Sequence, residues 1–267
     1  MINPLDREAL RNQFRNALPF PHMVIDNFLA PGVAEEISRS YPTFEQAAAQ
    51  GFMFNFVNEQ RKIQIVDSKK FPDPVRRLNE AISAPQFLTD LEYITGIPRL
   101  SADEQLLGGG MHLTGAGGRL DVHVDFNLIE ERKLFRRLNI LLYLNPVWNE
   151  AWGGHIELWD KDVKTCAYRC VPALNRCLIF QTSDISYHGV ARVTAPPEMV
   201  RQSFAAYYYT REAPPHWTGT SHSTIFRARP DEKLRGLVQM PMEKLRRRLA
   251  DKVSQSKKLV KTWIGRP

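Results

Sequence analysis

The sequence predicts an α+β protein in which helices come first and an antiparallel β-sandwich or barrel follows. Apolar residues recur at helical spacing through the first hundred residues, whereas short apolar runs of strand length dominate the second half. No long helical pattern separates those runs, which argues against alternating β-α-β units. Of the 267 residues, 43% are hydrophobic and 24% are charged, which excludes collagen-like, coiled-coil and wholly disordered classes.

Four amphipathic segments predict helices within residues 1–100. Capping residues, prolines and a final glycine mark their limits, at Asn3–Pro19, Pro31–Pro42, Asp73–Ile82 and Pro85–Gly96. Each carries apolar residues at a helical interval, as Leu10, Phe14 and Leu18 do in the first. Residues 52–67 are rich in aromatic and β-branched side chains and predict strand and loop. The segment 52–70 is also a candidate lid.

Short apolar runs predict the strands of the core, which we expect to span about residues 101–212. The runs are bounded by Asn, Pro, Gly or Asp and cover residues 138–144, 155–159, 177–180 and 204–209. Gly108–Gly110 and Gly115–Gly118 predict turns or bulges. Tyr207, Tyr208 and Tyr209 are expected to alternate between core and surface, because side chains alternate along a strand.

Basic charge is concentrated at the C-terminal end. Residues 227–267 hold 13 Lys and Arg against 4 Asp and Glu, a net charge of +9, whereas residues 1–226 hold 23 against 25, a net charge of −2. We expect residues 1–226 to form a single domain and residues 227–267 a basic helical tail. The stripe of Met242, Leu245, Leu249 and Val253 predicts that this helix docks on the body or on a second subunit. Because the body is almost neutral, nucleic acid is not an expected partner.

Other features favour an intracellular protein. Cys166, Cys170 and Cys177 are an odd number and too few for a disulfide framework, and their spacing lacks the second half of a zinc site. We expect free thiols in a reducing cytoplasm. The first residues carry no apolar signal segment, and no stretch approaches the length of a membrane span.

The chain holds one candidate metal site. His123 and Asp125 would point to the same face of a strand, and His188 would arrive from a distant one. Two histidines and one carboxylate on one face are typical of non-haem Fe(II) oxygenases, in which open coordination positions accept a co-substrate and O₂. The His-x-Asp triplet alone is a weak signal, because a hydrogen-bonded histidine beside a solvated aspartate gives the same pattern.

Arg201 strengthens this interpretation. It opens an apolar strand thirteen residues after His188, where a guanidinium at the interior or mouth of a barrel requires an anion. A dicarboxylate would satisfy it, and Ser203 shares its strand face and can donate to the same carboxylate. A core aspartate or glutamate would satisfy it equally.

Taken together, these motifs resemble those of the Fe(II)- and 2-oxoglutarate-dependent oxygenases, in their prolyl 4-hydroxylase-like branch. Besides the triad and Arg201-x-Ser203, the segments Pro19–Phe28, Tyr143–Trp148 and Gly153–Leu158 resemble segments of that branch. The resemblance covers about residues 19–212. It implies a double-stranded β-helix, or jelly roll, with the N-terminal helices packed on one sheet.

The resemblance also implies the cofactors and the roles of the site residues. His123, Asp125 and His188 would ligate Fe(II), while Arg201 and Ser203 would bind the distal carboxylate of 2-oxoglutarate. Where some relatives place a tyrosine to contact this co-substrate, the chain has Gly110–Leu113, so we expect a further contact from His112, Asn139 or Tyr143. O₂ would be the oxidant and ascorbate an accessory cofactor.

The implied activity is hydroxylation of an unactivated C–H of a small-molecule or peptidyl substrate, with release of succinate and CO₂. The intact Asp125 favours hydroxylation over halogenation, since halogenating relatives lack this carboxylate. Two alternatives stay open: a non-catalytic jelly-roll binding module, and an oxidative demethylase directed at nucleic acid.

Overall fold

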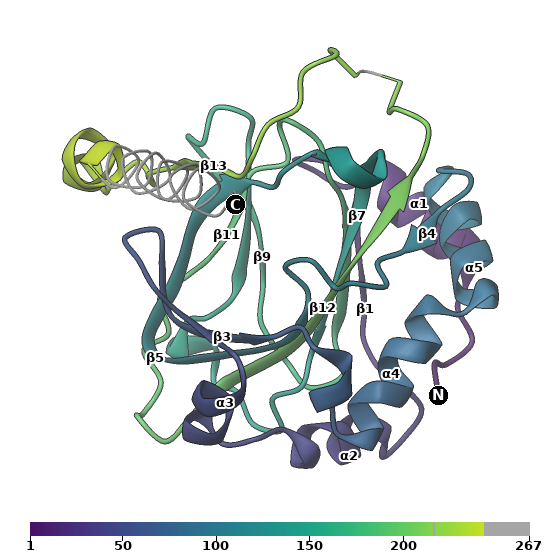
Figure 1. The fold of residues 1–267 in the computed structure, drawn as a ribbon, viewed down its shortest axis with the longest axis horizontal. Coiled ribbons are helices and arrows are strands. Elements are labelled where there is room, and N and C mark those ends of the chain that lie inside the picture. Colours follow the sequence, from purple (N-terminus) through teal and green to yellow (C-terminus); the bar gives the residue numbers. More distant parts are fainter. Residues whose placement is uncertain (216, 243–267) are drawn as a thin grey trace, which may run out of the picture.

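The fold is built on a strongly curved antiparallel sheet with helices on its outer side (Figure 1). The computed structural model describes residues 1–215 and 217–242. Within them the α-helices are α1 Arg7–Asn16, α2 Val33–Ser40, α3 Phe44–Gln50, α4 Asp73–Ser83 and α5 Pro85–Thr95. Shorter helical turns are η1 Ser68–Lys70, η2 Glu130–Arg132, η3 Glu150–Trp152 and the π-helix η4 Arg235–Gln239.

The described part of the chain contributes thirteen strands to one continuous sheet. They are β1 His22–Ile25, β2 Phe52–Asn55, β3 Glu59–Ile65, β4 Ser101–Ala102, β5 Gly110–Val124, β6 Leu128–Ile129, β7 Leu134–Tyr143, β8 Ile156–Trp159, β9 Cys166–Cys170, β10 Cys177–Gln181, β11 His188–Val190, β12 Arg201–Thr210 and β13 Ile225–Arg227. The main path runs β1-β10-β7-β12-β5-β11-β8-β9, so it curls as the expected jelly roll does.

The long strand β5 connects the two halves of the jelly roll. Its first half pairs with β12 and its second half with β11 and β13, while β3 pairs with both halves, from Met111 to Leu120. Between Thr114 and Arg119 the register with β3 shifts, because residues 115–118 form a bulge. The predicted glycine-rich turn or bulge is therefore a bulge within one strand, and Gly117 adopts a φ of +80° there.

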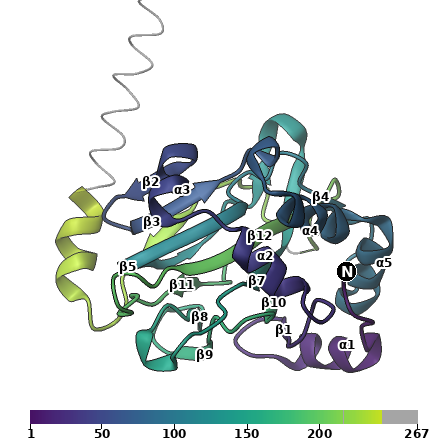
Figure 2. The ribbon, with the colours of Figure 1, turned by 90° about the horizontal axis from the view of Figure 1, so that it is seen from below.

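The helices cover one face of the sheet, as expected (Figure 2). The apolar residues of α1, α2, α4 and α5 join those of β3, β5, β7 and β12 in the largest core cluster, where Phe14, Ile37, Leu78, Leu91 and Leu138 are almost fully buried. The opposite face of the sheet lines the interior of the barrel. The burial pattern thus separates a helix-covered face from a face that is free to build a site.

Two details of the helical region differ from expectation. The first helix begins at Arg7, where the Asp6 carboxylate accepts from the amide of Ala9, and not at Asn3. The side chain of Asn3 donates instead to the carbonyls of Asn27 and Leu29, which keeps the first residues extended. The additional helix α3 begins with a capping box of Thr43 and Gln46.

The expected lid over residues 52–70 is wrong for the part of that segment that forms β3. β3 pairs with β5 from Glu59 to Ile65, and Ile63 and Ile65 are buried beneath the helices. A strand held by a ladder of hydrogen bonds and a buried apolar edge is a fixed part of the sheet. β2 lies at the margin of the sheet, with Phe52 exposed.

The three consecutive tyrosines are all buried, so the expected alternation between core and surface is wrong. Tyr208 packs among the helices, whereas Tyr207 and Tyr209 belong to a second cluster. The reason is that β12 lies between β5 and β7, where both faces of the strand are covered.

The C-terminal region is helical over residues 233–242. Before this helix, the strand β13 pairs with β5 and so belongs to the sheet. The expected domain boundary after residue 226 falls inside β13. Of the predicted apolar stripe, Leu245, Leu249 and Val253 lie outside the described residues. No described helix has the length and apolar character to cross a bilayer.

Candidate metal centre

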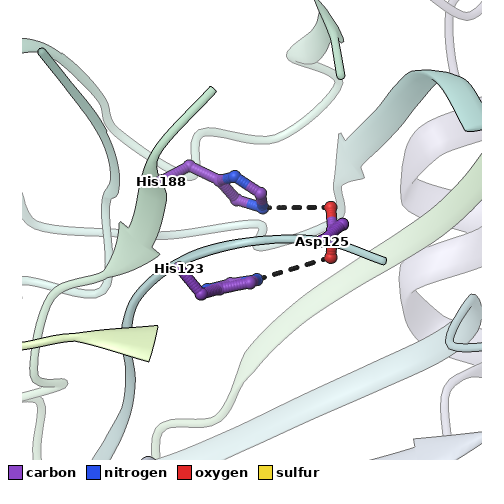
Figure 3. A group of neighbouring side chains, drawn as sticks. All are labelled: His123, Asp125 and His188. Atoms are coloured by element: carbon purple, nitrogen blue, oxygen red, sulfur yellow. Dashed lines mark ion pairs between the residues drawn. The ribbon is translucent and has the colours of Figure 1, made fainter. Parts of the chain in front are cut away.

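The structure brings the three predicted metal ligands together inside the barrel (Figure 3). His123 lies near the end of β5, and Asp125 follows directly after that strand. His188 opens β11 and is in register with His123, so that the centroids of the two rings are 4.3 Å apart. A pairing of strands 65 residues apart in sequence thus places both imidazoles on one side of Asp125.

The donor atoms of the three side chains converge. The Nε2 atom of His123 lies 3.5 Å from Oδ1 of Asp125, and Nε2 of His188 lies 3.5 Å from Oδ2. The ligand atoms all lie within 4.8 Å of one another. This is the spacing at which one small cation can contact all three.

Hydrogen bonds at the opposite ring nitrogens set the direction of both imidazoles. Nδ1 of His123 lies 2.9 Å from the carbonyl of Asp121, and Nδ1 of His188 lies 2.9 Å from the carbonyl of Ser186. A carbonyl can only accept, so each Nδ1 carries the proton and each Nε2 presents a lone pair to the centre. The chain's own residues therefore fit a divalent metal.

The ionisation of the triad suits the same role. Burial, and next the proximity of His123, lower the pKa of His188 to about 4, so that its ring is neutral near pH 7. Burial alone would raise the pKa of Asp125, but Arg136 and the two histidines hold it well below its ordinary value. A neutral imidazole at His188 and an ionised carboxylate at Asp125 are the forms that bind a metal.

Arg136 is a part of the centre that the sequence did not reveal. Its guanidinium lies 3.1 Å from Oδ2 of Asp125 and 3.5 Å from the ring centroid of Tyr207, and it is almost fully buried. It also donates through Nε to Oδ1 of Asn139 at 2.9 Å. Arg136 therefore contacts the Asp125 carboxylate at Oδ2 and holds it in place.

Asn139, expected among the co-substrate contacts, is placed on the metal side. Its amide donates to Oδ2 of Asp125 at 2.8 Å, and its oxygen accepts from Arg136. Both of its polar atoms are therefore engaged in orienting Asp125.

The remaining predicted residues meet at a second place on the inner face. β12 runs between β5 and β7, so Ser203 is opposite His112 on one side and Tyr143 on the other. Arg201 lies on the same face of β12 and donates to the Ser203 hydroxyl at 3.2 Å. Its Nε donates to the Gly154 carbonyl at 2.6 Å, a close approach in which a Cβ on Gly154 would lie 3.1 Å from Cδ of Arg201.

This second place has the chemistry of an anion site. Arg201 is 3% exposed, and no carboxylate in the described ranges forms an ion pair with it. Burial lowers the pKa of Arg201, which reflects the cost of a desolvated cation without a counter-ion. The Tyr143 hydroxyl is also buried and makes no hydrogen bond within the described residues. A buried cation and an unused hydroxyl side by side fit a carboxylate ligand.

His112 differs from Tyr143 in what it can offer. Its Nε2 donates to the Gly108 carbonyl at 3.2 Å, which leaves Nδ1 as an acceptor. Burial, followed by Lys62 and Arg201, holds the pKa of His112 well below its ordinary value, so the ring stays neutral. The free hydroxyl of Tyr143 is therefore the better donor to a carboxylate.

A cavity of about 450 Å³ opens beside the metal ligands. Asp125 and Arg136 line it, and its lining is largely apolar, with Phe20, Phe126, Ile185 and Trp217 among the other lining residues. A cavity of this size takes a small molecule or one side chain of a larger substrate.

Comparison with known proteins agrees with this geometry. Residues 109–209 match the 2OG-Fe(II) oxygenase superfamily. A stretch of 78 residues is 32% identical to the mouse protein prolyl 3-hydroxylase OGFOD1, covering 28% of this chain and 14% of that relative. The match therefore spans a small part of the relative's length.

Two solved structures share the fold. A prolyl-4-hydroxylase from Pseudomonas putida superposes with a TM-score of 0.52 at 14% identity, over 75% of this chain and 98% of that one. A prolyl hydroxylase from Trichoplax adhaerens, in complex with a hypoxia-inducible-factor peptide fragment, superposes with a TM-score of 0.54 at 18% identity, over 76% and 90%. The matched segment of residues 109–209 contains the whole triad together with Arg201 and Ser203, and it is similar to the Fe(II)- and 2-oxoglutarate-dependent oxygenases.

Proposed function

We propose that this chain is an Fe(II)- and 2-oxoglutarate-dependent dioxygenase that hydroxylates an unactivated C–H. One observation carries the proposal: two imidazole lone pairs and a carboxylate converge, and the same barrel holds a second buried group, Arg201, that has no carboxylate partner in the described residues. A metal and a dicarboxylate would complete the two places together.

In this proposal His123, Asp125 and His188 hold the Fe(II). The bound metal, with 2-oxoglutarate and O₂, supplies an oxidation that converts the co-substrate to succinate and CO₂ and hydroxylates the substrate. Asn139 and Arg136 both contact Oδ2 of Asp125, and these two contacts fix the carboxylate against rotation. The retained carboxylate favours hydroxylation over halogenation.

Arg201 anchors the far carboxylate of 2-oxoglutarate, with Ser203 and Tyr143 as further donors. The guanidinium is oriented before the ligand arrives, because Gly154 and Ser203 already hold it. A preorganised cation in a buried place binds a carboxylate more strongly than an exposed one would. The apolar walls around the site exclude water from the reacting atoms.

The substrate is a small molecule or a peptide that presents one C–H to the cavity beside Asp125. The volume and the largely apolar lining of this cavity suit an aliphatic or cyclic group, and Arg136 offers a donor among the lining residues. The peptide bound by the Trichoplax prolyl hydroxylase supports a peptidyl substrate. Nucleic acid is not proposed, because residues 1–226 carry a net charge of −2. We place the reaction in the cytoplasm.

The decisive experiment is a screen for substrate-dependent succinate formation. Protein purified without oxygen and supplied with Fe(II) and 2-oxoglutarate would be offered prolyl peptides, free amino acids and other small molecules. The expected result is that one class increases succinate and gains one oxygen atom, while a His188→Ala variant does neither. A protein that binds neither metal nor 2-oxoglutarate would contradict the proposal and favour a binding module.

A further inference from the structure

The C-terminal strap, residues 225–236, lies against the strand that carries His123 (Figure 1). Its strand β13 pairs with β5 so that Phe226 is opposite His123 and Arg227 is opposite Val122. β11 pairs with the same residue, His123, so β11 and β13 must occupy opposite edges of β5. At Leu120, β5 pairs with β11 on one edge and with β3 on the other. β3 and β13 therefore lie on the same edge of β5, and β3 ends just before the residues that β13 pairs with.

The strap therefore completes the edge of β5 at the metal centre. Without it, the backbone around His123 would be an open strand edge, with unpaired amide and carbonyl groups. This pairing also brings the Phe226 ring to 5.3 Å from the His123 ring, with 35° between the planes. For the second histidine, the ring centroid of Phe180 lies 4.7 Å from that of His188. Each histidine is thus supported by its own phenylalanine.

A buried charge network ties the strap to the same part of β5. Asp121 is fully buried, and its carboxylate lies 2.7 Å from Arg235, 3.6 Å from Arg229 and 2.5 Å from Arg119 of its own strand. Glu232 of the strap accepts from Arg119 in turn. The backbone carbonyl of Asp121 is the group that accepts from Nδ1 of His123. Anchoring this side chain therefore anchors the carbonyl that orients a metal ligand.

Arg229 extends the network to the neighbouring strand. Its Nε donates to Oε2 of Glu157 in β8 at 2.8 Å, and its Nη2 donates to the carbonyls of Leu120 and Val190. Leu120 and Val190 are opposite each other on β5 and β11, the two strands that bear the histidines. One arginine of the strap thus connects both ligand-bearing strands.

We propose that the strap is a positioning element of the metal centre, in which Phe226 fixes the plane of the His123 ring and Arg235 fixes the Asp121 segment that directs its Nε2. The proposal rests on the proposed metal-binding function. It assigns a role to the first part of a segment that composition alone describes as a basic tail. Changes in supporting groups of this kind typically weaken metal binding by about 10- to 100-fold.

The test is a Co(II) titration of the full-length chain, followed by visible absorption and checked for folding by circular dichroism. Phe226→Ala should bind Co(II) about 10- to 100-fold more weakly with an altered absorption band, and Phe226→Tyr should restore both. Ile225→Ala is the matched control, since this neighbour lies on the same strand but is 43% exposed. It should bind as the unaltered protein does.

Two further variants keep the test decisive. Phe226→Leu preserves apolar volume and decides the matter if Phe226→Ala does not fold; it should still show weaker Co(II) binding. Arg235→Gln should weaken binding by a smaller factor in the same direction. If the unaltered chain binds Co(II) and folded Phe226 variants bind it equally well, the strap is only structural and the inference fails. If the unaltered chain binds no Co(II), the proposed function itself fails.

Discussion

The two halves of the candidate site differ in how their charges are balanced. At the metal end, Oδ2 of the Asp125 carboxylate is contacted by Arg136 and Asn139, so its negative charge has partners from the chain. At the co-substrate end, the Arg201 guanidinium contacts the Gly154 carbonyl, the Ser203 hydroxyl and the ring of Tyr143, and no carboxylate among the described residues pairs with it. The Tyr143 hydroxyl beside it makes no hydrogen bond within the described residues.

This difference indicates what each half is built to bind. A metal would bind the Nε2 atoms and the carboxylate oxygen that face the centre. Other groups of the protein can therefore orient these side chains in advance through their remaining atoms. A dicarboxylate would bring its own negative charge, and Arg201 is the cation that we propose for it. A buried unpaired arginine is costly for folding, which makes it a better sign of a ligand than a well-paired one.

The largest expected effect is at the metal end. His123→Ala, Asp125→Ala and His188→Ala should each lose metal binding beyond the ~10- to 100-fold that a change in a supporting group causes, because each removes one of only three donors. Metal stoichiometry after anaerobic purification measures this. If His188→Ala kept full metal content and turnover without added imidazole, the triad would not be the metal site.

The next effect separates the two ends. Arg201→Ala should weaken 2-oxoglutarate binding by about 3–5 kcal/mol, or several hundredfold or more, because it leaves a buried carboxylate without its cation. Metal affinity should change little, since Arg201 contacts none of the three ligands in the described structure. Calorimetric titration of both ligands measures the split. If Arg201→Ala lowered the metal affinity and the 2-oxoglutarate affinity equally, the metal end and the co-substrate end would not bind their ligands independently.

A smaller effect is expected from the hydroxyl that assists Arg201. Ser203→Ala should weaken 2-oxoglutarate binding by about 1–3 kcal/mol at most, because one hydrogen bond to a charged group is lost. Ser203→Thr retains the hydroxyl and serves as the control. A Ser203→Ala protein with unchanged affinity would leave Tyr143 as the principal assisting donor, which Tyr143→Phe would then reveal.

The smallest effect concerns pH. Burial, then Lys62 and Arg201, hold the pKa of His112 well below 6.5 in the folded protein, whereas the unfolded chain takes up this proton near pH 6.5. The contribution of His112 to stability is therefore complete above pH 6.5 and is lost as the pH falls toward its folded pKa. The slope is at most about 1.4 kcal/mol per pH unit for one proton.

Urea unfolding at pH 7.5 and at pH 5.5 would measure this contribution. His112→Gln should lose less stability between these two pH values than the unaltered protein does. His22 carries a pKa lowered by burial as well and provides the background that both proteins share. An unchanged difference would mean that His112 is charged in the fold, and the co-substrate end would then hold a second cation.

Local patterns in the sequence determined the helices, several strands and the spacing of the site residues. The helices α4 and α5 follow from apolar residues at a helical interval, since that pattern depends only on neighbours along the chain. His123 and Asp125 were expected to point the same way for a similarly local reason. The first helix begins three residues after the expected start, because Asp6 and not Asn3 caps it.

Tertiary structure alone decided which distant residues meet. Simple alternation along β7 places Arg136 with Leu138 and Ile140 on the helix-covered face. The register with β12 shifts between Tyr208 and Tyr209, and this irregularity turns Arg136 inward onto Asp125. Likewise, the basic composition of the C-terminal region gave no sign that Phe226 and Arg235 would reach the segment of His123. Strand registers and bulges depend on contacts far apart in the chain, so no local pattern could contain them.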